Sequence, residues 1–297
     1  MLTHAFLVIA YNEPHILEAQ MHLLAHGGVS FYVNIDKKTQ GEKRKALVDV
    51  CRKYHAKVLH PAVDVRWGDY SLVDCELRLF KWAFSEGFDY YHLMSGVDLP
   101  IKSVEEIMSF FEQHKGENFI ELWTSDYDAQ DVTNKTRNYY FLLRYWRMGG
   151  ILAGILRKCH LAFLFIQKKL GVNRCKYDDM KLWKSSEWVS LTHDAVGYLL
   201  EQKKYIRSRF RWTHSSDEIY KSTVIMNSPL KDSLYHSPAF PRGYTNLQLT
   251  DWQRGKPWVW RKDDFKELID SPCLFARKFS SKYPEIIDLL ISELAKK

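Results

Sequence analysis

The first third of the chain alternates short, wholly apolar runs with longer segments in which apolar residues recur every three or four positions. Runs of the first kind are typical of strands buried on both faces, and segments of the second kind are typical of amphipathic helices. This order of strands and helices predicts a largely parallel sheet covered by helices. We expect strands over 5–11, 29–36, 56–60 and 89–96, with helices that start at Pro14 or cover 42–54 and 71–84.

The rest of the chain has a less regular pattern. The polar stretch 123–131 predicts a loop, and 135–170 predicts a basic, aromatic helical region interrupted at Gly149-Gly150. No internal repeat or low-complexity linker divides the sequence. Residues 1–297 therefore predict one α/β domain with halves 1–123 and 124–297. Its further expected elements are a strand running into a helix over 187–202, a helix capped by Ser215 or Ser216, a strand over 246–252, and helices over 263–270 and 284–294.

The composition allows a large core and favours an anionic partner. A hydrophobic content of 46% in 297 residues is enough for a full core, and the net charge of +7 suits nucleic acid, a nucleotide diphosphate or a membrane surface. The five cysteines are widely spaced and predict free thiols. The N-terminal apolar run lacks a basic leader and is interrupted by Asn12 and Glu13, so we expect a cytoplasmic location, either free or peripheral at the inner face of the membrane.

The ends of three predicted strands carry polar groups. In sheets of this kind ligands bind beyond the carboxyl ends of the strands. Those ends are Tyr11-Asn12, Asp36-Lys37 and Ser95-Gly96-Val97-Asp98, and we expect them to line one crevice.

Five separated motifs resemble the core-2/I-branching glycosyltransferase family, which also contains the peptide O-xylosyltransferases. They are AFLVIAYNEPHIL, RWGDYSLVDCELRL, LMSGVDLPIKS, THSSDEIYKSTVIMNSP (213–229) and SPCLFARKF, and the resemblance runs from about Ala5 to about Phe279. It implies a GT-A-type fold with a Rossmann-like mixed sheet. It also implies inverting transfer of a sugar, GlcNAc first and xylose next, from a UDP-sugar to a glycan hydroxyl. A role in bacterial surface polysaccharide synthesis is the expected setting.

The SSDE motif indicates the catalytic base. Inverting transfer needs one carboxylate to take the proton of the acceptor hydroxyl. The resemblance assigns this role to Glu218 and leaves Asp217 as a capping or orienting acid near the acceptor. The alternative is that Glu218 only stabilises the start of a helix as an acid in its first turn.

The resemblance implies that basic side chains, and no metal or other cofactor, neutralise the leaving diphosphate. The LFARKF motif indicates Lys278 for this role, with Arg254 or Lys256 as a second cation and Arg277 as an ordinary surface charge. Asp98 is expected to orient a donor hydroxyl or a cationic side chain, and the alternative is a strand-end turn stabilised by Asp98 and Pro100. The D-x-D sequence Asp126-Tyr127-Asp128 is interpreted as a polar loop.

The remaining predicted contacts are those of the nucleoside and the acceptor. The nucleotide is expected to meet Ala10, Asn12 and Asp36 at the strand ends, and Arg66 and Trp67 in the RWGDYS loop. For these residues the alternatives are turn formation and packing. The expected acceptor contacts are Glu121, Lys135, Arg137 and Trp252, together with Asp217. The alternatives for the acceptor contacts are salt bridges and core packing.

Two functions without catalysis compete with the enzyme. A nucleic-acid binding protein would use the basic and aromatic residues, but these are scattered and form no known motif. A membrane-surface module could use residues 139–170, where Arg and Lys mix with Trp, Phe and Leu, and it can coexist with transfer to a lipid-linked glycan. Its plain alternative is a pair of basic helices packed on the core.

Overall fold

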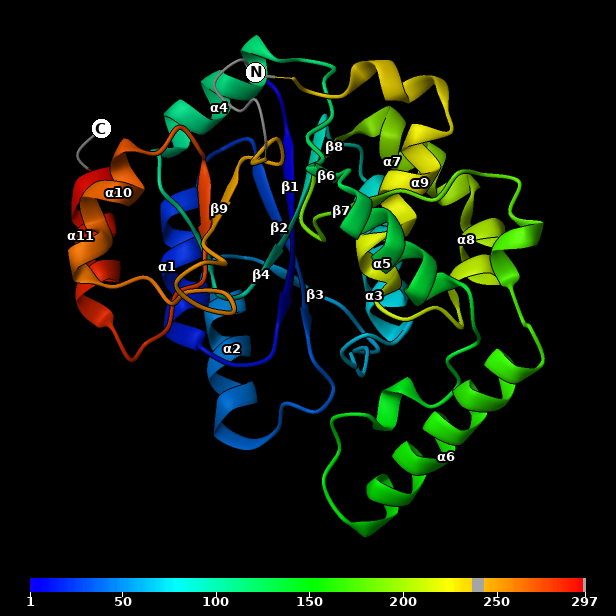
Figure 1. Ribbon diagram of the computed structural model, residues 1–297. Coiled ribbons are helices and arrows are strands. Elements are labelled where there is room, and N and C mark those ends of the chain that lie inside the picture. The colour runs from blue at the N-terminus through cyan, green and yellow to red at the C-terminus, as the bar shows by residue number, and fades with distance from the viewer. Residues whose placement is uncertain (237–242, 296–297) are drawn as a thin grey trace.

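The computed structural model describes residues 1–236 and 243–295 and is built around a five-stranded sheet (Figure 1). The strand order is β3-β2-β1-β4-β8. The first four strands are parallel, and β8 pairs antiparallel with β4 at one edge. Their bounds are β1 His4–Ala10, β2 Val29–Ile35, β3 Lys57–Val58, β4 Tyr90–Ser95 and β8 Ser190–Thr192.

Alternate residues of β1 belong to two different cores, because successive side chains of a strand point to opposite faces. Ala5, Leu7 and Ile9 pack with α3 (Ser71–Phe84), α7 (His193–Glu201) and α9 (Tyr220–Met226). Phe6, Val8 and Ala10 pack with α1 (Pro14–Leu24), α2 (Gly41–Lys53) and α4 (Val104–Gln113). The predicted parallel sheet with helices on both faces is confirmed.

A second, three-stranded sheet joins the segment after β4 to the C-terminal part of the chain. Its order is β5-β10-β9, formed by Asp98–Pro100, Phe275–Arg277 and Gln248–Thr250. The register places Arg277 opposite Asp98. The C-terminal LFARKF segment is thereby brought to the carboxyl end of β4. Beside this sheet lie η5 (Lys262–Asp264), α10 (Phe265–Asp270) and α11 (Pro284–Leu294).

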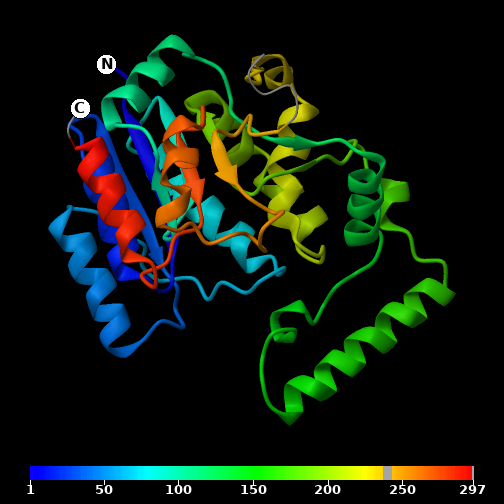
Figure 2. The ribbon, with the colours of Figure 1, turned by 60° about the vertical axis from the view of Figure 1, so that its left-hand side comes forward.

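The helix α6 lies at the periphery of the molecule in both views, away from the main sheet (Figures 1 and 2). It extends over Ile151–Lys169 and begins after Gly150, whose φ is 91°. Within the described residues, no helix is both long and apolar enough to cross a bilayer. The other elements of this region and of the connection to α9 are β6 Leu122–Trp123, α5 Asp126–Thr136, η1 Leu143–Tyr145, η2 Arg174–Tyr177, β7 Lys184–Ser185, α8 Lys203–Phe210, η3 Ser216–Glu218 and η4 Pro229–Ser233.

Three local predictions are wrong. The region 135–170 is not helical up to Gly149-Gly150, because between the end of α5 and the start of α6 only the short turn η1 is helical. The stretch 123–131 is not a loop, because α5 begins at Asp126, where Ser125 and Asp128 form a reciprocal capping box. The D-x-D sequence is therefore the first turn of a helix. The cap predicted at Ser215 or Ser216 is also absent, since Ser215 has a left-handed φ of 46° and neither serine caps a helix. Asp217 and Glu218 lie in a 3-10 turn, and α9 starts only at Tyr220.

Candidate active site

A crevice of about 780 Å³ opens at the carboxyl ends of β1, β2 and β4. Its wall includes Tyr11 and Asn12 after β1, Asp36 after β2, and Ser95 and Val97 at the end of β4, so the predicted gathering of these strand ends is confirmed. Three of the predicted residues, Lys37, Gly96 and Asp98, are not among its lining residues, whereas Lys38 is. A volume of this size is typical of sites that enclose a ligand as large as a nucleotide sugar.

Close packing of the strand ends shapes the floor of this crevice. A Cβ added to Gly96 would lie 2.9 Å from Cβ of Ala10, so only glycine lets the chain after β4 pass this close to β1. Ala10 itself is buried, and its carbonyl accepts the amide of Asp36 at 2.8 Å. Ala10 therefore supports the crevice and does not line it. Oδ1 of Asn12, by contrast, is buried in the wall and has no hydrogen-bond partner among the described residues.

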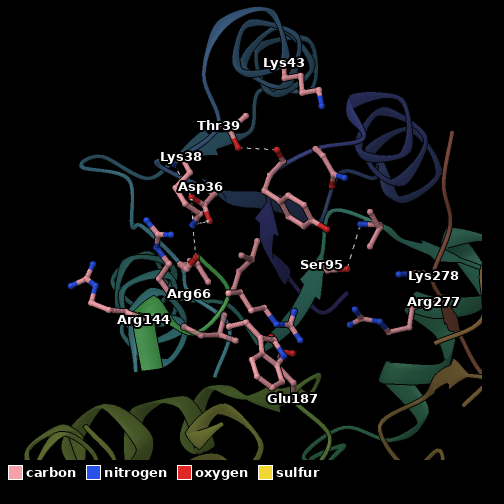
Figure 3. Close-up of a pocket in the computed structure, with 18 of the residues that line it drawn as sticks. Asp36, Lys38, Thr39, Lys43, Arg66, Ser95, Arg144, Glu187, Arg277 and Lys278 are labelled. Carbon is pink, nitrogen blue, oxygen red and sulfur yellow. Dashed lines mark hydrogen bonds and ion pairs between the residues drawn. The ribbon is translucent and has the colours of Figure 1, made fainter. Parts of the chain in front are cut away.

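The wall is strongly basic. Arg66 and Arg144 lie on one side of the crevice and Arg277 and Lys278 on the other, with Lys43 from α2 at a third (Figure 3). Lys38 is held by Asp36 at 2.7 Å and by Asp64 at 2.9 Å. The basic lining residues are Lys38, Lys43, Arg66, Arg144, Arg147, Arg277 and Lys278, whereas the acidic ones are Asp36 and Glu187. The excess of positive charge suits a polyphosphate.

Arg277 is placed by packing more than by charge. Its guanidinium lies 4.5 Å from the ring centroid of Trp188, and its Nε is 3.8 Å from Oδ1 of Asp98. That Nε has no hydrogen-bond partner among the described residues. The Asp98 carboxylate instead accepts the Ser95 hydroxyl at 2.6 Å, the Ser95 amide at 2.8 Å and the Gln248 amide at 2.9 Å. Asp98 is buried and lies opposite Arg277, and its two bonds to Ser95 also stabilise the turn after β4, so its orienting role stays a prediction.

The Arg66–Gly68 loop joins the crevice to the SSDE turn. Trp67 lines the crevice and packs edge-on against His214, with ring centroids 5.4 Å apart. The carbonyl of Gly68 accepts the amide of Ser215 at 2.9 Å. Gly68 has a φ of 71°, and a Cβ there would lie 3.2 Å from Nε2 of His214. The glycine of RWGDYS is thus required both by its backbone conformation and by the approach of the SSDE segment.

Glu218 does not line the crevice and lies beyond this loop in an ion pair. Nζ of Lys135 is 2.6 Å from Oε2 of Glu218 and 2.8 Å from Asp131. Burial acts to lower the pKa of Lys135, but these two carboxylates outweigh it and raise the pKa. The predicted base and the predicted acceptor residue Lys135 are therefore brought together, with Glu218 still partly open to solvent.

A row of acids connects Glu218 with the crevice. Asp217 is buried, and burial, followed by the charges of Glu218 and Glu76, raises its pKa from 3.8 to about 7. Glu187, which does line the crevice, has its pKa raised by desolvation and then by Asp217 and Glu76. A carboxyl group with a raised pKa is neutral over a wider pH range and can donate a hydrogen bond.

Several predicted residues lie away from the crevice. Arg254 is bound by three carboxylates, those of Asp251, Asp264 (2.8 Å) and Glu267 (2.8 Å). Lys256 does not line the crevice either, although the adjacent Pro257 does. The crevice is also not lined by the remaining predicted acceptor contacts, Glu121, Arg137 and Trp252. Glu121 is partly buried, and burial raises its pKa, whereas Arg137 is exposed and Trp252 is 60% exposed.

The sequence reasoning missed several residues of the wall. Arg277 was expected at the surface, and Glu187 and Lys43 were not singled out. A signal existed for Lys43, because it lies in the first turn of the helix that follows β2, where side chains face the strand ends. The other missed lining residues are Leu143, Arg144, Arg147 and Met148, from the segment before α6.

Known proteins resemble this chain over most of its length. Residues 4–268 match the family model Core-2/I-Branching enzyme. Xylosyltransferase 2 of Canis lupus familiaris is 22% identical over 323 residues, which cover 96% of this chain and 33% of the relative. Xylosyltransferase 1 of Homo sapiens is 21% identical over 311 residues, covering 93% and 29%. Mouse xyloside xylosyltransferase 1 has a similar solved structure, with a TM-score of 0.40 and 12% identity over 92% of this chain and 97% of that chain.

The chain belongs to the Core-2/I-branching enzyme family. The predicted α/β class, a mixed sheet covered by helices, is confirmed by the parallel-rich sheet and the helices on both of its faces. The chain spans about a third of the length of the curated relatives that it matches.

Proposed function

We propose that this chain is a glycosyltransferase that moves a sugar, with inversion, from a UDP-sugar to a hydroxyl of a glycan or lipid-linked glycan. The observation that carries the proposal is the basic crevice at the strand ends, which combines cations for a diphosphate with polar groups for a nucleoside. UDP-GlcNAc is the first donor to test. UDP-xylose follows closely, because the matched relatives are named xylosyltransferases.

In this reaction the acceptor oxygen bonds to the anomeric carbon while the bond to the β-phosphate oxygen breaks on the opposite face. The leaving UDP keeps the electron pair, and the acceptor proton passes to a carboxylate. We assign the proton to Glu218 and the leaving diphosphate to Lys278 and Arg277, which lie together in the wall. Arg277 takes the place in this proposal that Arg254 had in the sequence prediction, since Arg254 is held by three acids.

Glu187 is the other carboxylate to consider as the base, because it lines the crevice. Its raised pKa favours the neutral form, which cannot accept the acceptor proton but can donate a hydrogen bond to a sugar oxygen. Glu218 instead already holds the Lys135 ammonium beside it, as an ionised carboxylate does. The geometry thus favours Glu218 as base and Glu187 as a donor-sugar contact.

The test compares Glu218→Gln with Glu187→Gln in a UDP-release assay with each donor. A general base contributes about 100-fold or more, so Glu218→Gln should lower turnover by at least that factor while leaving UDP affinity unchanged. Glu187→Gln retains a neutral hydrogen-bonding group and should keep far more activity. Glu285→Gln, on α11, is the matched control and should behave as wild type. Turnover of Glu218→Gln within a few fold of wild type would reject Glu218 as the base.

The cytoplasmic location and the role in bacterial surface polysaccharide synthesis stay predictions. Nucleic-acid binding without catalysis is not favoured, since the basic residues of the crevice converge on one concave site and do not follow a groove along the surface.

A further inference from the structure

The net excess of positive charge comes from one segment of the chain. Residues 132–177, called the basic segment below, contain ten Lys and Arg residues and no Asp or Glu. The rest of the chain holds 33 basic and 36 acidic residues and is slightly negative. The basic segment covers the end of α5, η1, α6 and η2. An anionic partner with a defined contact surface is therefore expected to meet the molecule on this side.

The helix α6 has a polar or small inner side and an apolar outer side, which is the reverse of an ordinary surface helix. Its buried positions, Ala153, His160 and Gln167, face the chain before it, and the Gln167 side chain bonds both the amide and the carbonyl of Tyr139 at 2.8 and 3.0 Å. The outer side is large and apolar. Its exposed residues are Ile151 (87%), Leu152 (69%), Ile155 (52%), Leu161 (53%), Phe165 (60%) and Ile166 (52%), followed by Leu170 (75%) just beyond the helix.

Basic side chains accompany this apolar surface. Lys158, Lys168 and Lys169 are exposed on the same helix, and within the described part of the chain none of them forms an ion pair. Nζ of Lys169 lies 5.6 Å from the ring centroid of Phe165. An exposed aromatic and aliphatic surface with unpaired lysines and no acids combines the two features that bind a helix to an anionic lipid interface.

We propose that α6 docks on the surface of an anionic lipid bilayer, with its axis along the membrane plane. The apolar side chains enter the headgroup region and the lysines meet lipid phosphates. A helix of this length would lie along about 28 Å of the surface. Nucleic acid fits less well, because the exposed centre is aliphatic and offers no ring for each base. A second copy of this chain fits less well, because it would bring the same unpaired lysines together.

The docking surface is continuous with the crevice. Leu143, Arg144, Arg147 and Met148 line the crevice and directly precede α6 in the basic segment. A molecule held by α6 therefore has one wall of its crevice close to the lipid headgroups. This deepens the proposed function by indicating a lipid-linked acceptor, and that extension rests on the proposed function. The docking itself does not depend on catalysis.

The experiment is flotation of the full chain with phosphatidylcholine vesicles containing or lacking about 30% phosphatidylglycerol, without donor or acceptor. We expect binding to the anionic vesicles and much less to the neutral ones. Lys158→Glu/Lys168→Glu/Lys169→Glu should lower the partition coefficient by a hundredfold or more, because each lysine at an anionic surface contributes roughly fivefold. Ile155→Glu/Ile166→Glu should lower it as strongly.

A matched control reverses the same amount of charge elsewhere. Lys45→Glu/Lys262→Glu/Lys266→Glu changes exposed lysines on α2, η5 and α10 and should reduce binding only slightly. Unchanged UDP affinity and melting temperature show that each variant is folded. Wild type that stays in the bottom fraction and does not float with the anionic vesicles would overturn the proposal. Equal losses of vesicle binding in the two triple variants would also overturn it. A third contrary result is a wild-type dimer in light scattering that Ile155→Glu/Ile166→Glu dissociates, when neither the wild type nor this variant binds vesicles. If the wild-type chain floats with anionic vesicles but transfers no sugar from any donor, only the proposed function is refuted.

Discussion

Asp217 is a buried acid between two other carboxylates, and its burial has a thermodynamic consequence. In the unfolded chain its pKa is near the ordinary 3.8, whereas in the folded protein it is raised to about 7. The folded state therefore binds the proton more tightly. The favourable contribution of this group is fully present below about pH 4 and is lost as the pH rises through about 7.

Replacing Asp217 by Asn, which mimics the neutral carboxyl group, should remove this pH dependence. Relative to wild type, Asp217→Asn should gain stability between pH 4 and pH 8 by an amount on the order of 2–4 kcal/mol. Urea denaturation at several pH values measures the difference. Asp270→Asn, at an exposed position at the end of α10, is the control and should show no such trend. A difference between Asp217→Asn and wild type that is constant with pH would contradict the prediction.

Lys278 should act on the diphosphate and not on the nucleoside. It lines the crevice beside Arg277 and forms no ion pair within the described residues. A hydrogen bond to a charged group contributes about 1.5–3 kcal/mol, so Lys278→Ala should weaken UDP binding about tenfold or more and also slow turnover. Calorimetric titrations with UDP and with uridine measure this.

Uridine provides the internal control for Lys278. It lacks phosphates, so its affinity should be nearly the same in Lys278→Ala and in wild type. Lys282→Ala, an exposed lysine nearby in sequence, should leave both ligands unaffected. Equal UDP affinity in Lys278→Ala and wild type would assign Lys278 to the solvated surface.

The sequence predicted several strand-end residues that line the crevice, but it did not predict which C-terminal arginine does. Asn12 and Asp36 follow apolar runs, and the parallel order alone brings them to one edge. Arg254 and Arg277 are both basic residues of the C-terminal third, and their sequence surroundings do not distinguish them. What separates them is three-dimensional, since Asp264 and Glu267 occupy Arg254 while Trp188, from a distant segment, positions Arg277.

Among elements, α3 and α9 are joined by a fully buried ion pair. Nζ of Lys221 is 2.6 Å from Oε2 of Glu76, and both side chains are 0% exposed. The Tyr220 hydroxyl donates to the same oxygen at 2.6 Å, and Lys221 also donates to the carbonyl of Asp217 at 3.0 Å. The pair therefore holds the η3 turn that carries Glu218.

Removing one partner of this ion pair should lower the free energy of unfolding much more than removing both partners. Lys221→Met leaves Glu76 buried without its cation, and we expect a loss of about 3–5 kcal/mol in the free energy of unfolding. The double variant Glu76→Leu/Lys221→Met removes both charges and should recover a large part of that loss. Urea denaturation of both variants tests this. A single variant that loses less than the double variant would show that the pair is not a unit.

The elements themselves were largely predictable from the sequence where the apolar period was clear, as in β1, α3 and α11. The exceptions have local physical causes. The helix α5 is nearly all polar, so it has no apolar period, and its only sequence signal is the Ser125–Asp128 capping box. The η3 turn was mistaken for a helix start because Ser215 adopts a left-handed backbone conformation that the SSDE sequence does not reveal.

At the scale of the whole molecule, the proposed chemistry should need no metal ion. Among residues 1–236 and 243–295, no three His, Cys, Asp or Glu side chains are grouped to hold one. The cations of the crevice are placed to neutralise the diphosphate in its stead. We therefore expect UDP release to continue in excess EDTA at close to its full rate. A requirement for manganese or magnesium would refute this and return Asp98 and Asp128 to consideration as ligands.

The uneven distribution of charge also makes the molecule an electric dipole. The excess of ten positive charges lies in residues 132–177, at the periphery with α6, while the remainder is slightly negative. In the field of a negatively charged surface such a dipole experiences a torque before any contact forms, so the protein approaches already rotated with α6 leading. The encounter should therefore be fast at low ionic strength and slow steeply as added salt shortens the Debye length.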